Sequence, residues 1–163
     1  MTLKQLDNLE AVVQRDAIAT IWKGLSIAFE PPLEETVDSF DTLIDKVATH
    51  GKTFAYKKDG LVLGAVSFYA NDLESKSAFV TLLATDESAR GEGLGHALLS
   101  VAIRESQKFG MSRMRLDVRT ENDRAKRFYE SHGFVVVDRN SAFFTMSLDF
   151  NGSLPYMESR GVR

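Results

Sequence analysis

Hydrophobic and polar positions follow a helical period over the first fifty residues of the chain. Apolar side chains recur every three to four residues between Leu6 and Phe29, which predicts a helix over that range. Pro31 and Pro32 end it, because proline has no N–H to donate inside a helix. A second helix is predicted from Glu34 to about Thr49, with acidic residues in the first turn, where the helix dipole favours negative charge.

Three runs with the composition of β-strands follow the helical part. They cover Thr53 to Lys57, Leu61 to Ala70 and Ala78 to Thr85. Asp59 and Gly60, between the first two runs, both tolerate a positive φ, so they predict a tight hairpin. The second run is apolar on both faces, as expected of a central strand that is covered on both sides.

Helices and strands alternate in the second half of the chain. The predicted elements are, in order, an amphipathic helix from residue 90 to about Gly110, a strand over 113–118, a short helix from Asn122 to His132, and strands from Phe134 to Val137 and from Ala142 to Leu148. The tail beyond Asp149 has no clear pattern. The order ααβββαβαββ predicts an α/β or α+β fold, with a sheet of mixed direction flanked by helices.

Length and composition indicate one domain with a single core. The chain has 163 residues, of which 44% are hydrophobic, so we expect one domain over 1–163. The net charge of −3 argues against a general role in binding nucleic acid. The absence of cysteine excludes disulfides, thiolate nucleophiles and Cys-ligated zinc, and suits a reducing compartment. No secretory signal or membrane-spanning run is visible, so we expect a cytoplasmic protein without a membrane partner.

Charge is distributed unevenly between the two halves of the chain. Residues 1–89 carry 8 basic and 14 acidic side chains, whereas residues 90–163 carry 12 basic and 9 acidic ones. The basic excess between Arg113 and Arg127 is expected to help bind a polyanionic ligand, unless it is a solvated helix face. An acidic N-terminal half would attract a cationic substrate, and the KM would then depend on ionic strength.

The segment Arg90-Gly91-Glu92-Gly93-Leu94-Gly95 joins the end of a predicted strand to the start of a helix. Glycines let a ligand approach the backbone, and the first N–H groups of a helix have no partner inside it. The segment therefore predicts a site for phosphate or pyrophosphate. Neither the third glycine of G-x-G-x-x-G nor the Gly-Lys-Ser/Thr of a Walker loop is present, which excludes those two motifs.

This segment and a second motif resemble the GNAT superfamily of acyl-CoA-dependent N-acetyltransferases. The Arg/Gln-x-x-Gly-x-Gly/Ala signature of the superfamily is matched by Arg90, Gly93 and Gly95. The pattern Asn-x-x-Ala-x-x-(apolar)-Tyr-Glu-x-x-Gly-Phe is matched by Asn122, Ala125, Phe128, Tyr129, Glu130, Gly133 and Phe134. The resemblance is strongest over residues 60–137, and the stretch from Phe29 to Asp72 is also similar to a bacterial GNAT subgroup of unassigned substrate.

The resemblance implies a mostly antiparallel sheet that splays at the acyl-CoA site, with a cofactor-binding core at about residues 78–137. It implies that the N–H groups from Arg90 to Gly95 hold the CoA pyrophosphate and that Leu83 and Thr85 pair with pantetheine. Tyr129 would be the general acid that protonates the departing sulfur, and Asn122 would touch the cofactor. Two local alternatives stay open: Tyr129 packs with Phe128 in the core, and Asn122 caps its helix.

Two features of the superfamily have no clear counterpart. Many members carry a glutamate as general base in the strand before the signature loop, but the run Ala78 to Thr85 contains no acid. Glu30, Asp72, Glu74 and a water relay are the alternatives. The first strand of the superfamily is also hard to find before the helix predicted to start at Leu6, so that sheet edge is expected to be short or missing.

The histidines show no metal-ligand spacing. His50, His96 and His132 lie far apart in the sequence and form no H-E-x-x-H motif, so no metal is implied. His96 follows the signature loop directly, and we interpret it as a surface residue, with a position near the cofactor as the alternative.

The leading hypothesis is an N-acetyltransferase that moves acetyl from acetyl-CoA to a primary amine of a small molecule by direct attack. Acetylation of a protein or peptide is one alternative. A non-catalytic acyl-CoA-binding regulatory module is another, motivated by the missing strand glutamate. A homodimer is expected by family analogy and because the run Ala142 to Met146 could present apolar side chains at a sheet edge.

Overall fold

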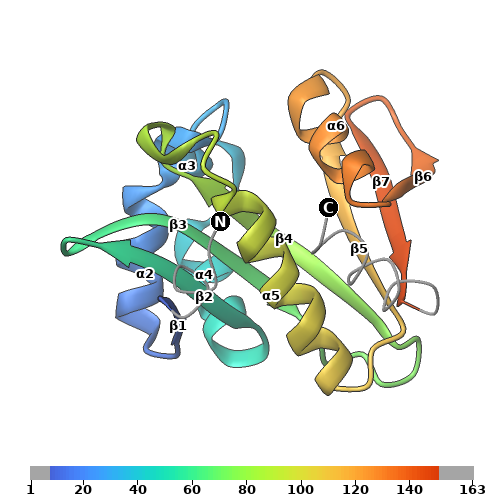
Figure 1. The fold of residues 1–163 in the computed structure, drawn as a ribbon, viewed down its shortest axis with the longest axis horizontal. Coiled ribbons are helices and arrows are strands. Elements are labelled where there is room, and N and C mark those ends of the chain that lie inside the picture. The colour runs from blue at the N-terminus through green and yellow to red at the C-terminus, as the bar shows by residue number, and fades with distance from the viewer. Residues whose placement is uncertain (1–7, 151–163) are drawn as a thin grey trace.

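The structure, a computed structural model, describes residues 8–150, which form a seven-stranded sheet with helices on both faces (Figure 1). The strands are β1 (Leu9–Val12), β2 (Lys52–Lys58), β3 (Leu61–Tyr69), β4 (Ser77–Thr85), β5 (Arg113–Arg119), β6 (Val135–Arg139) and β7 (Phe143–Asp149). The helices are α2 (Arg15–Gly24), α3 (Leu33–Thr36), α4 (Phe40–His50), α5 (Leu94–Lys108) and α6 (Asp123–Ser131), with short 3-10 helices at Ser26–Ala28 and Glu87–Ala89.

The strands follow the order β1-β2-β3-β4-β5-β7-β6 across the sheet. Only β4 and β5 run parallel, because α5 connects them as a crossover, and all other neighbours are antiparallel. The mixed, mostly antiparallel sheet flanked by helices is as the sequence predicted.

Two hydrophobic clusters cover the two faces of the sheet. Val66 and Phe68 of β3 belong to the cluster under α5 and α6, while Ala65 belongs to the cluster under α2 and α4. Burial on both faces explains why the sequence of β3 is apolar almost throughout. In the second cluster the indole N–H of buried Trp22 donates to Ser67 Oγ at 3.0 Å, which satisfies two buried polar groups.

The prediction of one helix from Leu6 to Phe29 is wrong. Within its described part, residues 9–12 form β1, which pairs antiparallel with β2 at the edge of the sheet. The helix α2 begins only at Arg15. This short segment is extended because it pairs with β2. The spacing of its apolar residues, from which the helix was predicted, gives no information about that pairing. The edge strand that was expected to be short or missing is present and short, with four residues.

The second predicted helix is also interrupted. Val37 is extended between α3 and α4, and Ser39 caps α4 by accepting a hydrogen bond from the backbone N–H of Thr42 at 3.1 Å. Serine is a preferred N-cap, so it starts a new helix here instead of continuing the first.

The apolar run Ala142 to Met146 was expected at a sheet edge, but β7 lies between β5 and β6. The edge strand is β6, whose three valines, Val135, Val136 and Val137, are 60%, 40% and 48% exposed. The hairpin that joins β6 to β7 turns back toward β5, which puts the later strand inside. The tail beyond residue 150 lies outside the described residues.

Candidate active site

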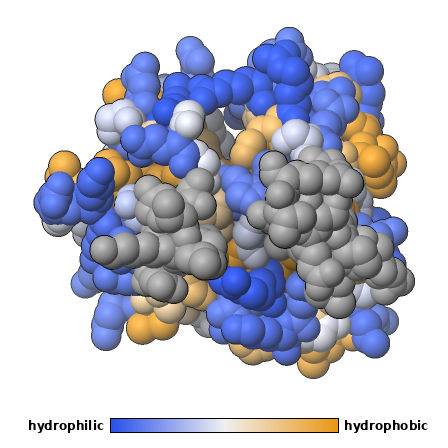
Figure 2. Space-filling model, in the orientation of Figure 1, coloured by the Kyte–Doolittle hydropathy of each residue, from blue (hydrophilic) through white to orange (hydrophobic). Residues whose placement is uncertain are grey.

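The strands β4 and β5 separate after a short stretch of pairing, which opens the sheet between them (Figure 1). Pairing extends only from Ser77 opposite Arg113 to Phe79 opposite Arg115. Beyond it, β4 continues beside β3, and β5 continues beside β7. Because the pair is parallel, both carboxyl ends lie at the open end, where ligands bind in α/β sheets. The predicted splay is confirmed, and Figure 2 shows the surface hollowed between the two halves.

A β-bulge at Thr81 changes the face that β4 presents. β3 pairs with Val80 and with Leu82 but skips Thr81. Val80 consequently packs in the cluster under α5, and Leu82 packs against α2 and α4. The bulge leaves Leu83 and Thr85, the predicted pantetheine contacts, half-buried on the strand that borders the opening.

Five consecutive backbone N–H groups are available where β4 leads into α5. Gly91 and Gly93 have φ values of 85° and 80°, a region that glycine occupies without strain. Among residues 8–150, the N–H groups from Gly91 to Gly95 have no hydrogen-bond acceptor. A run of such groups at the N-terminus of a helix favours an anion. The predicted phosphate loop therefore offers N–H groups to an anion from Gly91 to Gly95. The N–H of Arg90, which was expected to join them, instead donates to the carbonyl oxygen of Glu87 at 3.2 Å.

The first turn of α5 is fixed to the sheet through Gly64 of β3. A Cβ on Gly64 would lie 2.8 Å from Leu94 Cδ2 and 3.0 Å from Leu98 Cδ1, so any other residue there would force these leucine side chains to shift. Leu94 is buried there, and only its N–H is left for a ligand. Arg90 and Glu92 have exposed side chains on the loop.

The helix α6 begins at the same open end, after β5. Asn122 Oδ1 accepts a hydrogen bond from the N–H of Ala125 at 3.0 Å, so Asn122 caps the helix. The ring of Tyr129 lies edge-on to Phe128 and Phe134, with centroid distances of 5.2 and 5.6 Å. Burial raises the pKa of the Tyr129 phenol above its ordinary value, so its hydroxyl keeps its proton at neutral pH. Asn122 thus caps its helix and Tyr129 packs with Phe128, and neither arrangement prevents contact with a ligand.

The carboxylates proposed from sequence lie away from the opening or on the surface. Asp72 and Glu74 are in the loop before β4, at the closed end of the β4–β5 pair. Asp72 accepts hydrogen bonds from Ser75 Oγ at 2.6 Å and from Ser75 N at 3.0 Å, which lowers the pKa of Asp72 and makes it a weaker base. Glu30 is exposed before α3.

Sequence reasoning missed Asp117 as a candidate base. Alternate residues of β5, such as Leu116 and Val118, are buried under α5 and α6, which leaves Asp117 exposed on the other face. It lies beyond the last β4–β5 pair, and its Oδ1 accepts a hydrogen bond from Thr145 Oγ1 at 2.9 Å. A carboxylate thus borders the opening on the face opposite the phosphate loop. Asp117 borders the opening because the pairing of β4 with β5 ends before it, and no sequence motif indicates where that pairing ends.

The basic excess divides between two faces of the protein. Arg115 and Arg119 lie on the same face of β5 as Asp117, whereas Arg124 and Arg127 are exposed on α6. The basic residues between Arg113 and Arg127 are therefore close in sequence but do not form a single surface.

The interpretation of His96 as a surface residue is wrong. His96 is half-buried in the first turn of α5, and its Nδ1 lies 2.7 Å from Nε2 of His132.

Over residues 8–150 no group of three His, Cys, Asp or Glu side chains could hold a metal ion. In the same range, no helix has the length and apolar character needed to cross a membrane.

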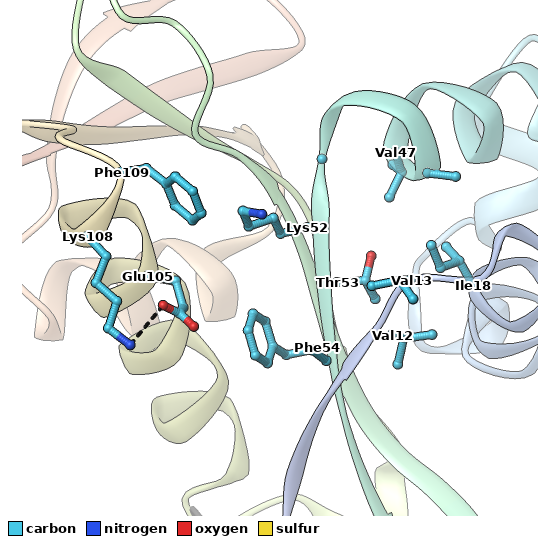
Figure 3. A pocket seen from close by; sticks show the side chains of 13 residues that line it. Val12, Val13, Ile18, Val47, Lys52, Thr53, Phe54, Glu105, Lys108 and Phe109 are labelled. Atoms are coloured by element: carbon cyan, nitrogen blue, oxygen red, sulfur yellow. Dashed lines mark ion pairs between the residues drawn. The ribbon is translucent and has the colours of Figure 1, made fainter.

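A separate pocket of about 300 Å³ lies at the far end of α5 (Figure 3). Its lining includes Val12, Thr53 and Phe54 from β1 and β2, and Glu105 and Phe109 near the end of α5. α5 spans roughly 20 Å at 1.5 Å per residue, so this pocket is distant from the phosphate loop. It contains none of the predicted site residues.

Comparison with known proteins identifies the family. A sequence model of the acetyltransferase (GNAT) family matches residues 18–134. The chain belongs to this family.

Individual relatives are more distant. Mycothiol acetyltransferase of Beutenbergia cavernae is 35% identical over 79 residues, which is 48% of this chain and 26% of that protein, so the chain matches only about a quarter of that relative. The ribosomal-protein-S18-alanine N-acetyltransferase of Escherichia coli shares the fold at 21% identity and a TM-score of 0.69, covering 86% of this chain and 93% of the other. The PaiA N-acetyltransferase of Thermoplasma acidophilum, solved with coenzyme A, shares it at 16% identity and a TM-score of 0.66, covering 86% and 98%.

Proposed function

We propose that the chain is an N-acetyltransferase that moves acetyl from acetyl-CoA to a primary amine of a small molecule by direct attack. The proposal rests on the opening between β4 and β5, which lies beside the N–H groups of Gly91 to Gly95. Residues 8–150 provide no acceptor for these groups. Those N–H groups fit the pyrophosphate of CoA. The free edge of β4 at Leu83 and Thr85 fits pantetheine, whose amides bind to a strand edge as a peptide does.

The proposed reaction needs one acid and one base. The amine nitrogen attacks the thioester carbonyl carbon, the C–S bond breaks, and sulfur leaves with the bonding electron pair. The hydroxyl of Tyr129 donates a proton to that sulfur, and a base takes a proton from the amine, so charge balances. A free thiol has a pKa of about 8.5, so the thiolate is already a fair leaving group and the acid contributes moderately.

We propose Asp117 as the base. The phosphates of CoA would bind at the start of α5, on one face of the sheet, and the acetyl group would then reach through the opening. The amine would approach it from the opposite face. Asp117 borders the opening on that face, and the bond from Thr145 Oγ1 holds its carboxylate in place. A carboxylate there also attracts a cationic amine before it loses its proton.

Replacement of Asp117 by asparagine is expected to lower kcat/KM about 100-fold at neutral pH, because general-base catalysis contributes at least that much. The affinity for acetyl-CoA should not change. Asp138→Asn is the matched control, since Asp138 is exposed on β6 opposite the same Thr145 of β7. Equal kinetics of the two variants would exclude Asp117 as the base.

Release of free CoA thiol from acetyl-CoA, measured across a panel of small amines, tests the proposed function. The chain contains no cysteine, so it does not react with the thiol reagent. Turnover with one class of small amine is the expected result. Calorimetric titration with acetyl-CoA is run in parallel, and a chain that neither binds acetyl-CoA nor releases thiol would contradict the proposal.

Acetylation of a protein N-terminus is the second candidate function. It is favoured by the likeness to the ribosomal-protein alanine N-acetyltransferase, although that likeness is one of fold. Peptides with free N-termini in the same amine panel separate the two functions. A higher kcat/KM for peptides than for every small amine would favour protein acetylation.

We also propose that the chain forms a homodimer through β6. An exposed edge strand with three valines is a surface that proteins usually cover. Light scattering should give a mass of about twice 18.2 kDa for the wild type and 18.2 kDa for Val136→Lys. Val13→Lys is the control, because Val13 is 79% exposed just after β1, at the other edge of the sheet. A wild-type monomer would dismiss the dimer.

A further inference from the structure

The side chains of His96 and His132 join the two halves of the split sheet. His96 belongs to α5, which packs on β2, β3 and β4. His132 follows α6, which is connected to β5 and β6. Their imidazoles are 2.7 Å apart, from Nδ1 of His96 to Nε2 of His132. β4 and β5 hold the halves together at the closed end, and this hydrogen bond, here called the histidine bridge, links them at the helices.

The surroundings of His132 fix the direction of the histidine bridge. Its Nδ1 lies 2.8 Å from the carbonyl oxygen of Phe128, which can only accept, so Nδ1 carries a hydrogen and donates. In the neutral ring, Nε2 then has a lone pair and accepts from the Nδ1–H of His96. With His132 neutral, the bond runs from a donor on α5 to an acceptor at the end of α6.

Phe128 strengthens the same contact. Its ring centroid is 4.6 Å from that of His132. A Cβ on Gly95 would lie 3.3 Å from Phe128 Cζ, so the glycine lets the ring reach the first turn of α5. Tyr129 is the next residue of α6 and packs edge-on to Phe128. The histidine bridge, Phe128 and Tyr129 thus form one connected set.

The two bridged helices are anchored unequally. α5 has eight fully buried residues, whereas those of α6, Tyr129 among them, are at most partly buried. Loss of the histidine bridge should therefore displace α6, with Tyr129, and leave the phosphate loop at the start of α5 in place. Proton transfer depends steeply on position, since a misplacement of about 1 Å can cost as much as 100-fold in rate.

We propose that His96 and His132 are positioning residues that hold the hydroxyl of Tyr129 at the sulfur of the acyl-CoA. The inference rests on the proposed function and deepens it, because it assigns a role to two residues outside the reacting groups. It predicts that loss of the histidine bridge lowers kcat, because Tyr129 is displaced, and leaves the affinity for acyl-CoA unchanged.

The test compares four variants of the full chain by kcat, KM and the Kd for acetyl-CoA. His96→Leu and His132→Leu should each lower kcat about tenfold, with the Kd within about twofold of wild type. His96→Asn should stay near wild type, because its amide N–H occupies the place of Nδ1 and can donate to His132. His50→Leu is the control, since His50 is exposed at the end of α4 and takes no part in the bridge.

A double-mutant cycle with Tyr129→Phe separates positioning from general stability. Calorimetric stoichiometry gives the concentration of binding-competent protein in each variant, so partial unfolding cannot pass for a lower kcat. The leucine substitutions should cost nothing further once the hydroxyl of Tyr129 is gone. Additive losses, or leucine variants that match wild type in a working enzyme, would overturn the positioning role alone. A wild-type chain without acetyl-CoA binding would overturn the proposed function and this role together.

Discussion

Replacement of Gly91 by valine is expected to weaken acetyl-CoA binding at least about 30-fold. A β-branched residue at a φ of 85° is strained, so the loop must shift its backbone. A shift misdirects the N–H groups that would hold the pyrophosphate, and each hydrogen bond to a charged group contributes about 1.5–3 kcal/mol. Loss of one such bond accounts for roughly tenfold in affinity, and loss of two for about 100-fold or more. Calorimetric titration with acetyl-CoA measures the change.

Gly110→Val is the matched control for that substitution. Gly110 has a φ of 84° and, like Gly91, no atom within 4 Å of an added Cβ, so the backbone strain is similar. It follows α5, at the opposite end of the helix from the phosphate loop. Similar losses of acetyl-CoA affinity in both variants would mean that strain, and not the loop, is responsible.

Replacement of Tyr129 by phenylalanine is expected to lower kcat about 100-fold, with acetyl-CoA affinity retained. The substitution removes only the hydroxyl, and a general acid acts in the transition state and not in binding. Because burial raises the pKa of Tyr129, the wild-type acid stays protonated through pH 9, so Tyr129 should cause no loss of kcat up to that pH. Initial rates at saturating acetyl-CoA and amine, from pH 6 to 9, measure both effects.

Tyr69→Phe is the control for the loss of a tyrosine hydroxyl. The hydroxyl of Tyr69 is buried without a hydrogen-bond partner among the described residues, and burial raises its pKa as well. Tyr69 ends β3, opposite Phe79 at the closed end of the β4–β5 pair. Its substitution should leave kcat unchanged. A comparable loss of kcat in the two variants would remove the case for Tyr129 as the acid.

Local sequence signals predicted the parts of the site that local structure determines. The phosphate loop depends on glycines at positive φ and on the start of an amphipathic helix, and both are visible in the sequence. The same holds for Asn122, whose capping role follows from its residue type and position.

Long-range contacts account for what the sequence did not predict. β1 forms because residues 9–12 pair with a strand that begins forty residues later, which no helical period can report. His96 and His132 are separated by 36 residues and meet only because α5 and α6 lie on the same face of the sheet. The position of Asp117 depends on where the pairing of β4 with β5 ends, and the register of that pairing is a property of the whole sheet.

A titration of the chain with acetyl-CoA, followed on backbone amide resonances by NMR, tests the central claim most directly. The account predicts that the amide signals of Gly91, Gly93 and Gly95 shift, because their N–H groups gain an acceptor, while those of Gly60 and Gly110 stay in place. Shifts confined to other regions, such as the pocket at the far end of α5, or no shifts at all, would contradict the assignment of the opening between β4 and β5 as the acyl-CoA site.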